Sequence, residues 1–441
     1  MNPAAPTVWL TTLGCAKNQV DSDKVTGMLM SAGYAEATTP EAADVVMVNT
    51  CGFIEPARRE SIDTILDLAG AKRDDASLVV IGCMAQRYET ELTDALPEAD
   101  AIVGLDRYPE LIDRLDALTT WAPITIGLAR RSHMDILYET RRPTPNTPYA
   151  YVKAAEGCDK LCTFCAIPQF RGKQRSRSAD NIREEIAELA EAGVAEIGLV
   201  AQDLAAYGRD IDGPDIVDLV QRVTTVEGLR RLRLYYLYPR EIRPRLISEM
   251  AENSLVADYF DLSLQHTSPG LLRAMKRPGS GERHRELIDR IRGAAPDAAL
   301  RSSFIVGFPG ETDEDVDGLA AFLTEVGLDW AGFFPYSPED GTAAATMESQ
   351  VPEAEKQSRL RHLQSIQDEI TTGRSIDQIG RTMTVVVDQV EDDQPVARSY
   401  REAPEIDGVI LLDKGIPGEW LEVEVVGGYG TDLDAVVRRP V

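Results

Sequence analysis

Between Val8 and about Trp121, hydrophobic residues form short and almost continuous runs, each followed by a longer stretch with helical spacing. The runs predict strands at 8–13, 44–48 and 78–81, and the intervening stretches predict helices at 21–32 and 55–69. Runs this continuous are typical of parallel strands that are buried on both faces. The pattern therefore predicts a doubly wound α/β domain over residues 1–125.

The same alternation resumes after a segment rich in Pro and Arg, which we interpret as a linker over 126–148. Six further strands are expected, separated by helical stretches, and they lie at 149–155, 196–201, 231–237, 259–264, 300–306 and 329–336. Six strand-helix units are fewer than the eight of a closed barrel. Residues 149–375 are thus predicted to form a partial (βα)6 barrel.

From about Ile376 the pattern changes to short segments in which polar and apolar residues alternate, at 384–388, 408–412 and 420–426. This pattern indicates a small antiparallel β-barrel over 376–441. The segment carries six Lys or Arg and fourteen Asp or Glu, a net charge of −8. Such a module is expected to bind a basic protein surface more readily than a phosphate backbone.

The whole chain is acidic, with 46 Lys and Arg against 73 Asp and Glu and a formal charge of −27. Non-specific binding to nucleic acid is disfavoured at that charge, so nucleic acid is not expected as a primary partner. No window approaches the ~18 uninterrupted apolar residues of a membrane span, and the first residues lack the regions of a signal peptide. We therefore expect a cytoplasmic protein with reduced thiols and no membrane partner.

Three cysteines lie close together in the run Glu156-Gly-Cys158-Asp-Lys-Leu-Cys162-Thr-Phe-Cys165. So few backbone atoms separate them that their sulfurs can converge on one metal centre. Zinc normally takes a fourth protein ligand, and none is obvious nearby, since the closest histidine, His133, lies well upstream. Three thiolates suit a 4Fe-4S cluster with one open iron. The alternative is three buried cysteines that bind no metal.

The other three cysteines, Cys15, Cys51 and Cys83, each follow a predicted strand of the first domain and have a glycine beside them. Because ligands of an open parallel sheet bind outside the carboxyl ends of its strands, these thiols are expected to meet at one edge. A second three-thiolate cluster is favoured over three buried structural cysteines.

Polar residues at other strand ends of the second domain are candidates for binding a cofactor. Gln202 and Asp203 follow one strand, and Gly307, Gly310 and Glu311 follow another. The glycines would let the backbone approach an adenosine moiety, and Gln202 or Asp203 could hold a ribose or an amino acid portion. The segment from Gly307 is equally well read as a tight turn that caps the next helix. His266 is assigned no role.

Several motifs resemble the methylthiotransferases, a family of radical S-adenosylmethionine enzymes. They are Thr-Leu-Gly-Cys15-Ala-Lys-Asn, Val-Asn-Thr-Cys51-Gly-Phe-Ile, Ile-Gly-Cys83-Met-Ala-Gln-Arg and Glu-Gly-Cys158-Asp-Lys-Leu-Cys162-Thr-Phe-Cys165-Ala-Ile-Pro. Further marks, Gln169-Phe-Arg171-Gly172, Tyr236-Leu-Tyr-Pro239 and the run from Arg398 to Gly408, resemble the branch that modifies an aspartate of small-subunit ribosomal protein S twelve. The resemblance covers essentially the whole chain. Ala16 departs from it, because that branch often has proline after the first cysteine, and this puts only the local turn in doubt.

The resemblance implies a domain arrangement and a chemistry. It implies an N-terminal cluster domain, a radical S-adenosylmethionine domain and a C-terminal TRAM domain. The expected cofactors are two 4Fe-4S clusters and S-adenosylmethionine, with one cluster at Cys158, Cys162 and Cys165 for radical formation and a sulfur-carrying cluster at the other three cysteines. The expected reaction adds a methylthio group to the β-carbon of the aspartate and requires an electron donor.

Two other functions remain open. One is methylthiolation of a tRNA adenosine beside the anticodon, which the acidic terminal module disfavours, and the other is a zinc-binding scaffold without catalysis. For the ribosomal protein substrate, acidic residues of the terminal module are expected to form the docking surface, with Glu402, Glu405 and Asp407 as candidates.

Overall fold

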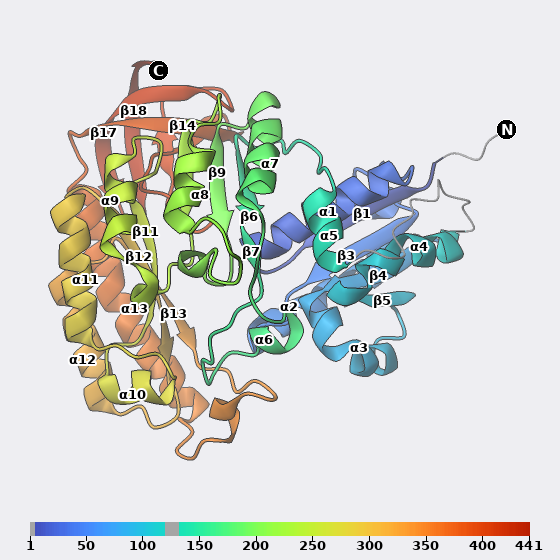
Figure 1. Ribbon diagram of the computed structural model, residues 1–441, viewed down its shortest axis with the longest axis horizontal. Coiled ribbons are helices and arrows are strands. Elements are labelled where there is room, and N and C mark those ends of the chain that lie inside the picture. Colours follow the sequence, from blue (N-terminus) through green and yellow to red (C-terminus); the bar gives the residue numbers. More distant parts are fainter. Residues whose placement is uncertain (1–4, 120–131) are drawn as a thin grey trace. The chain divides into compact units, whose positions relative to one another are not determined.

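The computed structural model describes residues 5–119 and 132–441, which divide into two compact units (Figure 1). Unit 1 comprises Met1–Pro143, Glu156–Lys160 and Cys165–Arg177, and unit 2 comprises Thr144–Ala155, Leu161–Phe164 and Ser178–Val441. The predicted linker lies partly outside the described residues, at 126–131. None of the helices in the described ranges is long and apolar enough to cross a membrane.

A five-stranded sheet forms the centre of unit 1, in the order β2-β1-β3-β4-β5 with every neighbouring pair parallel. The strands are β1 (Thr7–Thr12), β2 (Ala35–Glu36), β3 (Val45–Thr50), β4 (Ser77–Gly82) and β5 (Ala101–Gly104). The helices are α1 (Ala16–Ser31), α2 (Glu55–Ala71), α3 (Cys83–Ala95), α4 (Leu111–Thr119), α5 (His133–Glu139) and α6 (Ile167–Phe170), and β8 (Arg175–Ser176) also lies in this unit. The sequence predicts the three central strands, but β2 and β5 are too short to show in its pattern.

Alternate residues of the central strands pack on opposite faces of this sheet. Val45 and Met47 of β3 belong to a core with α1 and α4, whereas Val46 and Val48 belong to a second core with α2 and α3. Successive side chains of a strand point to opposite faces, so both faces are covered by helices. The doubly wound sheet expected from the sequence is confirmed.

Six parallel strands form the barrel part of unit 2, arranged as two three-stranded sheets with the orders β10-β9-β6 and β11-β12-β13. Isolated parallel bridges, Leu232 with Val256 and Leu237 with Leu262, join the two sheets. The strands are β6 (Tyr149–Lys153), β9 (Glu196–Val200), β10 (Arg231–Leu234), β11 (Tyr259–Gln265), β12 (Ala299–Val306) and β13 (Trp330–Pro335), with β7 (Ala155–Glu156) next to β6 in the chain. The predicted partial barrel is confirmed.

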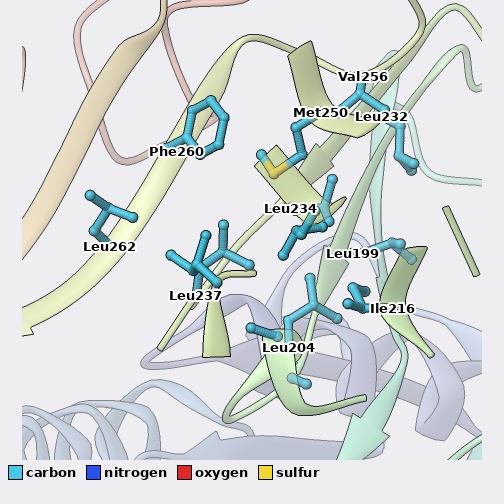
Figure 2. Close-up of a cluster of buried hydrophobic side chains, with 14 of the residues drawn as sticks. Leu199, Leu204, Ile216, Leu232, Leu234, Leu237, Met250, Val256, Phe260 and Leu262 are labelled. Carbon is cyan, nitrogen blue, oxygen red and sulfur yellow. The ribbon is translucent and has the colours of Figure 1, made fainter. Parts of the chain in front are cut away.

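Leucine, isoleucine and phenylalanine side chains from these strands and from the helices fill one continuous core (Figure 2). Leu199, Leu234 and Leu262 are completely buried in it. The helices of this part are α7 (Ala179–Glu191), α8 (Ile216–Val223), α9 (Pro244–Glu252), α10 (Pro269–Ala274), α11 (Gly281–Ala294), α12 (Asp313–Val326) and α13 (Glu353–Ile376). Burial of the apolar stripe of each helix against the strands holds the strand ends in place.

The C-terminal module is a closed barrel of five strands in the order β14-β15-β16-β18-β17. Its strands are β14 (Thr382–Glu391), β15 (Gln394–Arg398), β16 (Ile410–Leu412), β17 (Trp420–Tyr429) and β18 (Asp432–Pro440). The pairs are antiparallel except that β16 and β18 run parallel. The small barrel is confirmed, although the expectation of a wholly antiparallel one is wrong for this closing pair.

Buried ion pairs attach the C-terminal module to the barrel strands of unit 2. Glu196 on β9 contacts three arginines, with distances of 3.0 Å to Arg231, 2.6 Å to Arg233 and 2.9 Å to Arg398 of the module. Arg231 and Arg233 also donate hydrogen bonds to the carbonyl oxygen of Ser399. The module is therefore docked through one carboxylate, a set of guanidinium groups and backbone carbonyls.

The expectation that Glu402 and Asp407 lie on an exposed acidic surface is wrong. Glu402 is 1% exposed and its carboxylate accepts hydrogen bonds from the backbone N–H and the hydroxyl of Ser399. The Asp407 side chain is 2% exposed and contacts Arg301 of β12 at 3.3 Å. Both carboxylates are used inside unit 2, where they stabilise the loop between β15 and β16. Glu405 alone of the three is exposed, and it accepts a hydrogen bond from the Tyr149 hydroxyl.

Candidate functional site

Cys15, Cys51 and Cys83 lie at the carboxyl ends of three neighbouring strands of unit 1. Cys15 is the N-cap residue of α1, Cys51 directly follows β3, and Cys83 is the first residue of α3 after β4. Since β1, β3 and β4 are adjacent and parallel, their ends share one edge of the sheet. The strand ends are placed as the sequence predicts.

Two of the glycines beside these cysteines are required because the neighbouring cysteine approaches their backbone closely. A Cβ atom at Gly14 would lie 2.8 Å from the Cβ atom and 3.0 Å from the Sγ atom of Cys51, and Gly14 has a φ of +97°. A Cβ atom at Gly52 would lie 2.9 Å from the backbone of Cys83. The first and third strand ends thus press against the second with no room for side chains between them.

The three thiols influence one another electrostatically. Burial, together with the neighbouring Cys15 and Cys83, raises the pKa of the Cys51 thiol to about 12. Burial also raises the pKa of Cys83. For Cys15, burial opposes ionisation, but the charges of Lys17 and Arg171 outweigh it and lower the pKa. Cys51 thus lies within the field of the other two thiols, and the positive charge of Arg171 acts on all three.

Arg171 supplies one of these positive charges from within a buried network of unit 1. Its Nη1 atom donates to both carboxylate oxygens of Glu156 at 2.9 Å, and its Nη2 atom lies 3.0 Å from Asp21. The same Nη2 atom lies 2.7 Å from Oδ1 of Asn18 and 2.9 Å from Sγ of Cys83. A guanidinium therefore reaches a candidate ligand sulfur directly, and two carboxylates hold it there.

The contact of Arg171 with Cys83 was not predicted from the sequence, although Arg171 belongs to one of the motifs that resemble the family. Asp21 and Glu156 were not singled out either. The available signal was that Glu156 and Arg171 flank the cysteine loop, because charged residues next to buried segments need partners. Nothing in the spacing shows that the partners are the ends of β1 and β4.

The cysteine loop that follows β7 is anchored at both ends. In unit 1, the Cys158 N–H donates to the Gly172 carbonyl at 3.1 Å, and the Lys160 N–H points to Sγ of Cys158 at 3.4 Å. In unit 2, Arg277 lies 3.6 Å from Sγ of Cys162. Cys158 and Cys165 belong to unit 1 and Cys162 to unit 2. The convergence of the three sulfurs stays a prediction from their spacing.

No group of three or more His, Cys, Asp and Glu side chains in the described ranges converges closely enough to hold a single metal ion. A polynuclear cluster places its own iron and sulfide between the thiolates, so three thiols need only share one small region. The donor set at the edge of the unit 1 sheet, three soft thiols beside cationic groups, fits such a cluster. It does not match a mononuclear zinc site, which takes four ligands in contact with one ion.

The candidate cofactor residues of unit 2 follow β9 and β12. Asp203 is 3% exposed and is the N-cap residue of the short helix Leu204–Ala206. Gly307 has a φ of +76°, and a Cβ atom there would lie 2.3 Å from the Lys356 side chain. Gly310 also has a positive φ, of +84°, with open space around its Cβ position. Gly310 thus offers an accessible backbone, whereas Gly307 is enclosed by Lys356.

Glu311 is buried within this turn and used by the protein itself. Both of its carboxylate oxygens accept from the Gly307 N–H at 2.9 Å, and Arg359 lies 3.1 Å away. His266 also faces it at 3.5 Å. The Nδ1 atom of His266 accepts from the N–H groups of Thr267 and Ser268, so in the neutral ring the Nε2 atom carries the proton that points to Glu311.

Three family models match the chain. Residues 7–104 match the uncharacterized protein family UPF0004, residues 152–323 match the radical SAM superfamily, and residues 379–437 match the TRAM domain. The three matches lie in three successive parts of the chain.

Two full-length relatives carry the same description. The ribosomal protein uS12 methylthiotransferase RimO of Streptomyces coelicolor is 40% identical, covering 98% of this chain and 97% of that protein. The protein of that name from Anaeromyxobacter sp. is 41% identical and covers 99% of this chain and 94% of its own length.

A solved structure with a similar fold is the radical S-adenosylmethionine methyltransferase TsrM from Kitasatospora setae, determined with cobalamin and a [4Fe-4S] cluster bound. It covers 77% of each chain with a TM-score of 0.56 and 14% sequence identity. At this identity the likeness concerns the fold alone.

Proposed function

Since this chain belongs to the RimO family of ribosomal protein uS12 methylthiotransferases, which are radical S-adenosylmethionine enzymes, we propose that it adds a methylthio group to an aspartate of uS12. The observation that carries the proposal is the similarity of about two residues in five over nearly the full length of both chains. The β-carbon of the aspartate as the modified atom follows from the motif resemblance.

The six cysteines would hold two 4Fe-4S clusters, one at Cys158, Cys162 and Cys165 and the other at Cys15, Cys51 and Cys83. When bound, the first cluster and S-adenosylmethionine supply an electron and a carbon radical, and the second supplies the sulfur. Three thiols per site, with no fourth protein ligand among residues 5–119 and 132–441, would leave room for an exchangeable group. An electron donor is required from outside the chain.

The protein's own contribution at the unit 1 edge is charge and position. Three thiolates in a buried place repel one another, and the Arg171 guanidinium offsets that charge at Cys83. Glu156 and Asp21 hold the guanidinium in one orientation, since its Nη1 and Nη2 atoms are both engaged. We assign Arg171 as a positioning residue for the sulfur of Cys83.

In unit 2 the cofactor would lie along the ends of β9 and β12. Gln202 and Asp203 are the polar contacts that we propose for its ribose or amino acid portion, and Gly310 is the place where its adenosine meets open backbone. Glu311 is assigned to the shape of the turn, because its oxygens bind the Gly307 N–H and Arg359. Gly307 contributes through the backbone conformation of that turn.

The experiment uses anaerobically reconstituted full-length protein, S-adenosylmethionine, a sulfide source, a chemical reductant and purified uS12. We expect 5'-deoxyadenosine and a methylthiolated aspartate, detected by mass spectrometry. Replacing Cys15, Cys51 and Cys83 together by Ala should keep 5'-deoxyadenosine formation but remove the product. A parallel reaction offers tRNA in place of uS12, and preferential tRNA modification would overturn the substrate. Protein that binds zinc and takes up no iron would overturn the enzyme altogether.

A further inference from the structure

A pocket of about 520 Å³ opens on unit 2, and none of the candidate cofactor residues discussed above lines it. It is lined by Pro239, Arg240, Ile242, Arg243, Pro244, Pro278, Gly279, Arg283, His284, Glu286, Leu287 and Arg290. Its volume falls within the range of about 300–1,000 Å³ that is usual for ligand sites. Its lining segments follow β10 and β11 in the chain, so they start from the carboxyl ends of those strands.

Four arginines dominate the chemistry of this pocket. Arg240, Arg243, Arg283 and Arg290 are all exposed, and Glu286 is the one carboxylate in the lining, all of which lies in the described part of the chain. His284 adds no charge near neutral pH, because burial lowers its pKa to about 4. The pocket is therefore strongly positive in a protein whose formal charge is −27.

None of the four arginines forms an ion pair with a carboxylate of the described residues. Two other exposed arginines of unit 2 do: Arg245 lies 2.7 Å from Asp215, and Arg381 lies 2.8 Å from Asp297. With 73 acidic and 46 basic residues in the chain, acidic partners are abundant. Four arginines without one, gathered around a single cavity, indicate that the partner is an external anion.

The local backbone adds to the positive field. Arg243 is the N-cap residue of α9, and the first turn of α11 also lines the pocket, with Ser280 as its N-cap residue. Both helices thus direct the positive ends of their dipoles to this place. Arg283, Glu286, Leu287 and Arg290 recur at helical spacing, so they form one face of α11.

The distance between the arginines on this face of α11 indicates which kind of anion fits the pocket. Seven residues separate Arg283 from Arg290, which corresponds to about 10 Å along the helix axis. That span exceeds a single phosphate or carboxylate, but it suits consecutive phosphate groups, which the planar fork of arginine binds in a bidentate manner.

We propose that this pocket, which we call the arginine pocket, is a binding site for consecutive phosphate groups, with an exposed RNA backbone as the occupant. The choice of RNA rests on the proposed function, because the substrate proposed there, a ribosomal protein, is itself a partner of ribosomal RNA. The site itself does not rest on it. At physiological salt the screening length is about 8 Å, so remote acidic residues do not cancel the field of four arginines around one cavity.

The test measures binding of a short fluorescein-labelled single-stranded RNA to the full-length protein by fluorescence anisotropy over a series of salt concentrations. The double substitution Arg243→Gln with Arg283→Gln is expected to weaken binding at least tenfold at low salt. It should also reduce the slope of log K against log salt by about 1.4, since each phosphate contact of a single strand contributes about 0.7. Glu286→Gln should tighten binding.

The matched control is Arg183→Gln with Arg361→Gln, which removes two exposed arginines of unit 2 that lie outside the pocket. It changes the net charge equally and should leave the affinity within twofold. If both double variants lose affinity alike, the pocket is not the site. Absence of RNA binding to the unaltered protein at low salt would also overturn the proposal.

Three competitors identify the anion that the pocket binds. Unlabelled RNA that displaces the probe, while a nucleoside triphosphate does not, supports an RNA backbone. Equal displacement by the triphosphate at similar concentration would retain the phosphate site and overturn RNA as its occupant. Displacement by oligoglutamate of equal charge would overturn the assignment to phosphate. None of these readouts uses methylthiolation, so failure of the proposed function would leave them unchanged.

Discussion

Both units bury a guanidinium network, but the two networks have opposite stoichiometry. In unit 1, one arginine, Arg171, is shared by two carboxylates, an amide oxygen and a cysteine sulfur. In unit 2, one carboxylate, Glu196, is shared by three arginines that also donate to backbone carbonyls and to Asp388. All partners of the second network are ordinary protein groups, whereas the first includes a candidate metal ligand. From this difference we infer that the first network supports the candidate ligand Cys83 and that the second attaches the C-terminal module.

The largest expected effect breaks the unit 1 network. Arg171→Met would leave Glu156 and Asp21 buried without their cation, and removing one partner of such a pair costs about 3–5 kcal/mol of folding free energy. We also expect the reconstituted iron content to fall toward half, because Arg171 contacts a candidate ligand of only one cluster, Cys83 of the set Cys15, Cys51 and Cys83. Iron and sulfide analysis together with urea unfolding measure the two effects.

Arg171→Lys is the matched control for that experiment, since it keeps the positive charge but loses the planar guanidinium that binds several partners at once. It should restore part of the iron and part of the stability. An Arg171→Met protein with full iron content would show that the contact with Cys83 has no role in cluster binding.

The second prediction breaks the unit 2 network. Glu196→Gln keeps the shape but leaves three buried arginines without their shared anion, which should cost about 3 kcal/mol. Iron content and 5'-deoxyadenosine formation should not change in the protein that remains folded. Trp330 and Trp420 lie in this region, so tryptophan fluorescence during urea unfolding reports the loss. Glu405→Gln, an exposed carboxylate of the same module, should cost less than about 0.5 kcal/mol. Loss of iron in the Glu196 variant would contradict the division of roles.

Much of this arrangement could be predicted from the sequence, and the exceptions have a physical cause. The strands appear in the hydrophobic pattern because each is long and apolar, as with Val45–Thr50. Cys15, Cys51 and Cys83 could be placed because parallel strands end at one edge. The burial of Glu402 and Asp407 could not be predicted, because a charged residue taken on its own is expected to be exposed to solvent. For Asp407 the available signal was Arg301 in the strand Ala299–Val306, because a charged residue within a buried strand requires a partner.

The third prediction concerns a buried histidine of unit 2. Burial lowers the pKa of His284 to about 4 from 6.5, so the folded state favours the neutral ring. Its contribution to stability is present above pH 6.5 and is lost as the pH falls toward 4. Between pH 7 and pH 5 the loss should be about 2 kcal/mol. His284→Gln should remove that part of the pH dependence, as measured by urea unfolding at each pH, and an unchanged pH profile would exclude the histidine as its source.

The smallest expected effect is a gain in stability as the pH falls, opposite to the loss expected from His284. It comes from Asp407 and distinguishes this carboxylate from Glu196 within unit 2. Burial raises the pKa of Asp407 to about 6 from 3.8, although the nearby Arg301 opposes the rise. Its stabilising contribution is therefore present below pH 3.8 and is lost as the pH rises through 6. Between pH 7 and pH 5 it should add about 1 kcal/mol to the stability. Asp407→Asn should abolish this increment, whereas Glu196, whose pKa its three arginines hold below the usual range against the effect of burial, should add none in that interval.

The parallel pairing of β16 with β18 has a consequence for the order of events during synthesis. β18 is the last of the five strands in chain order, yet it pairs with both β16 and β17, so the barrel of the module cannot close until β18 has left the ribosome. Arg398 therefore reaches Glu196 from a module that is still open, or the two meet only after translation has passed β18. Until Arg398 docks, Arg231, Arg233 and Glu196 on the barrel strands form an incomplete charged face, which the nascent chain must keep hydrated.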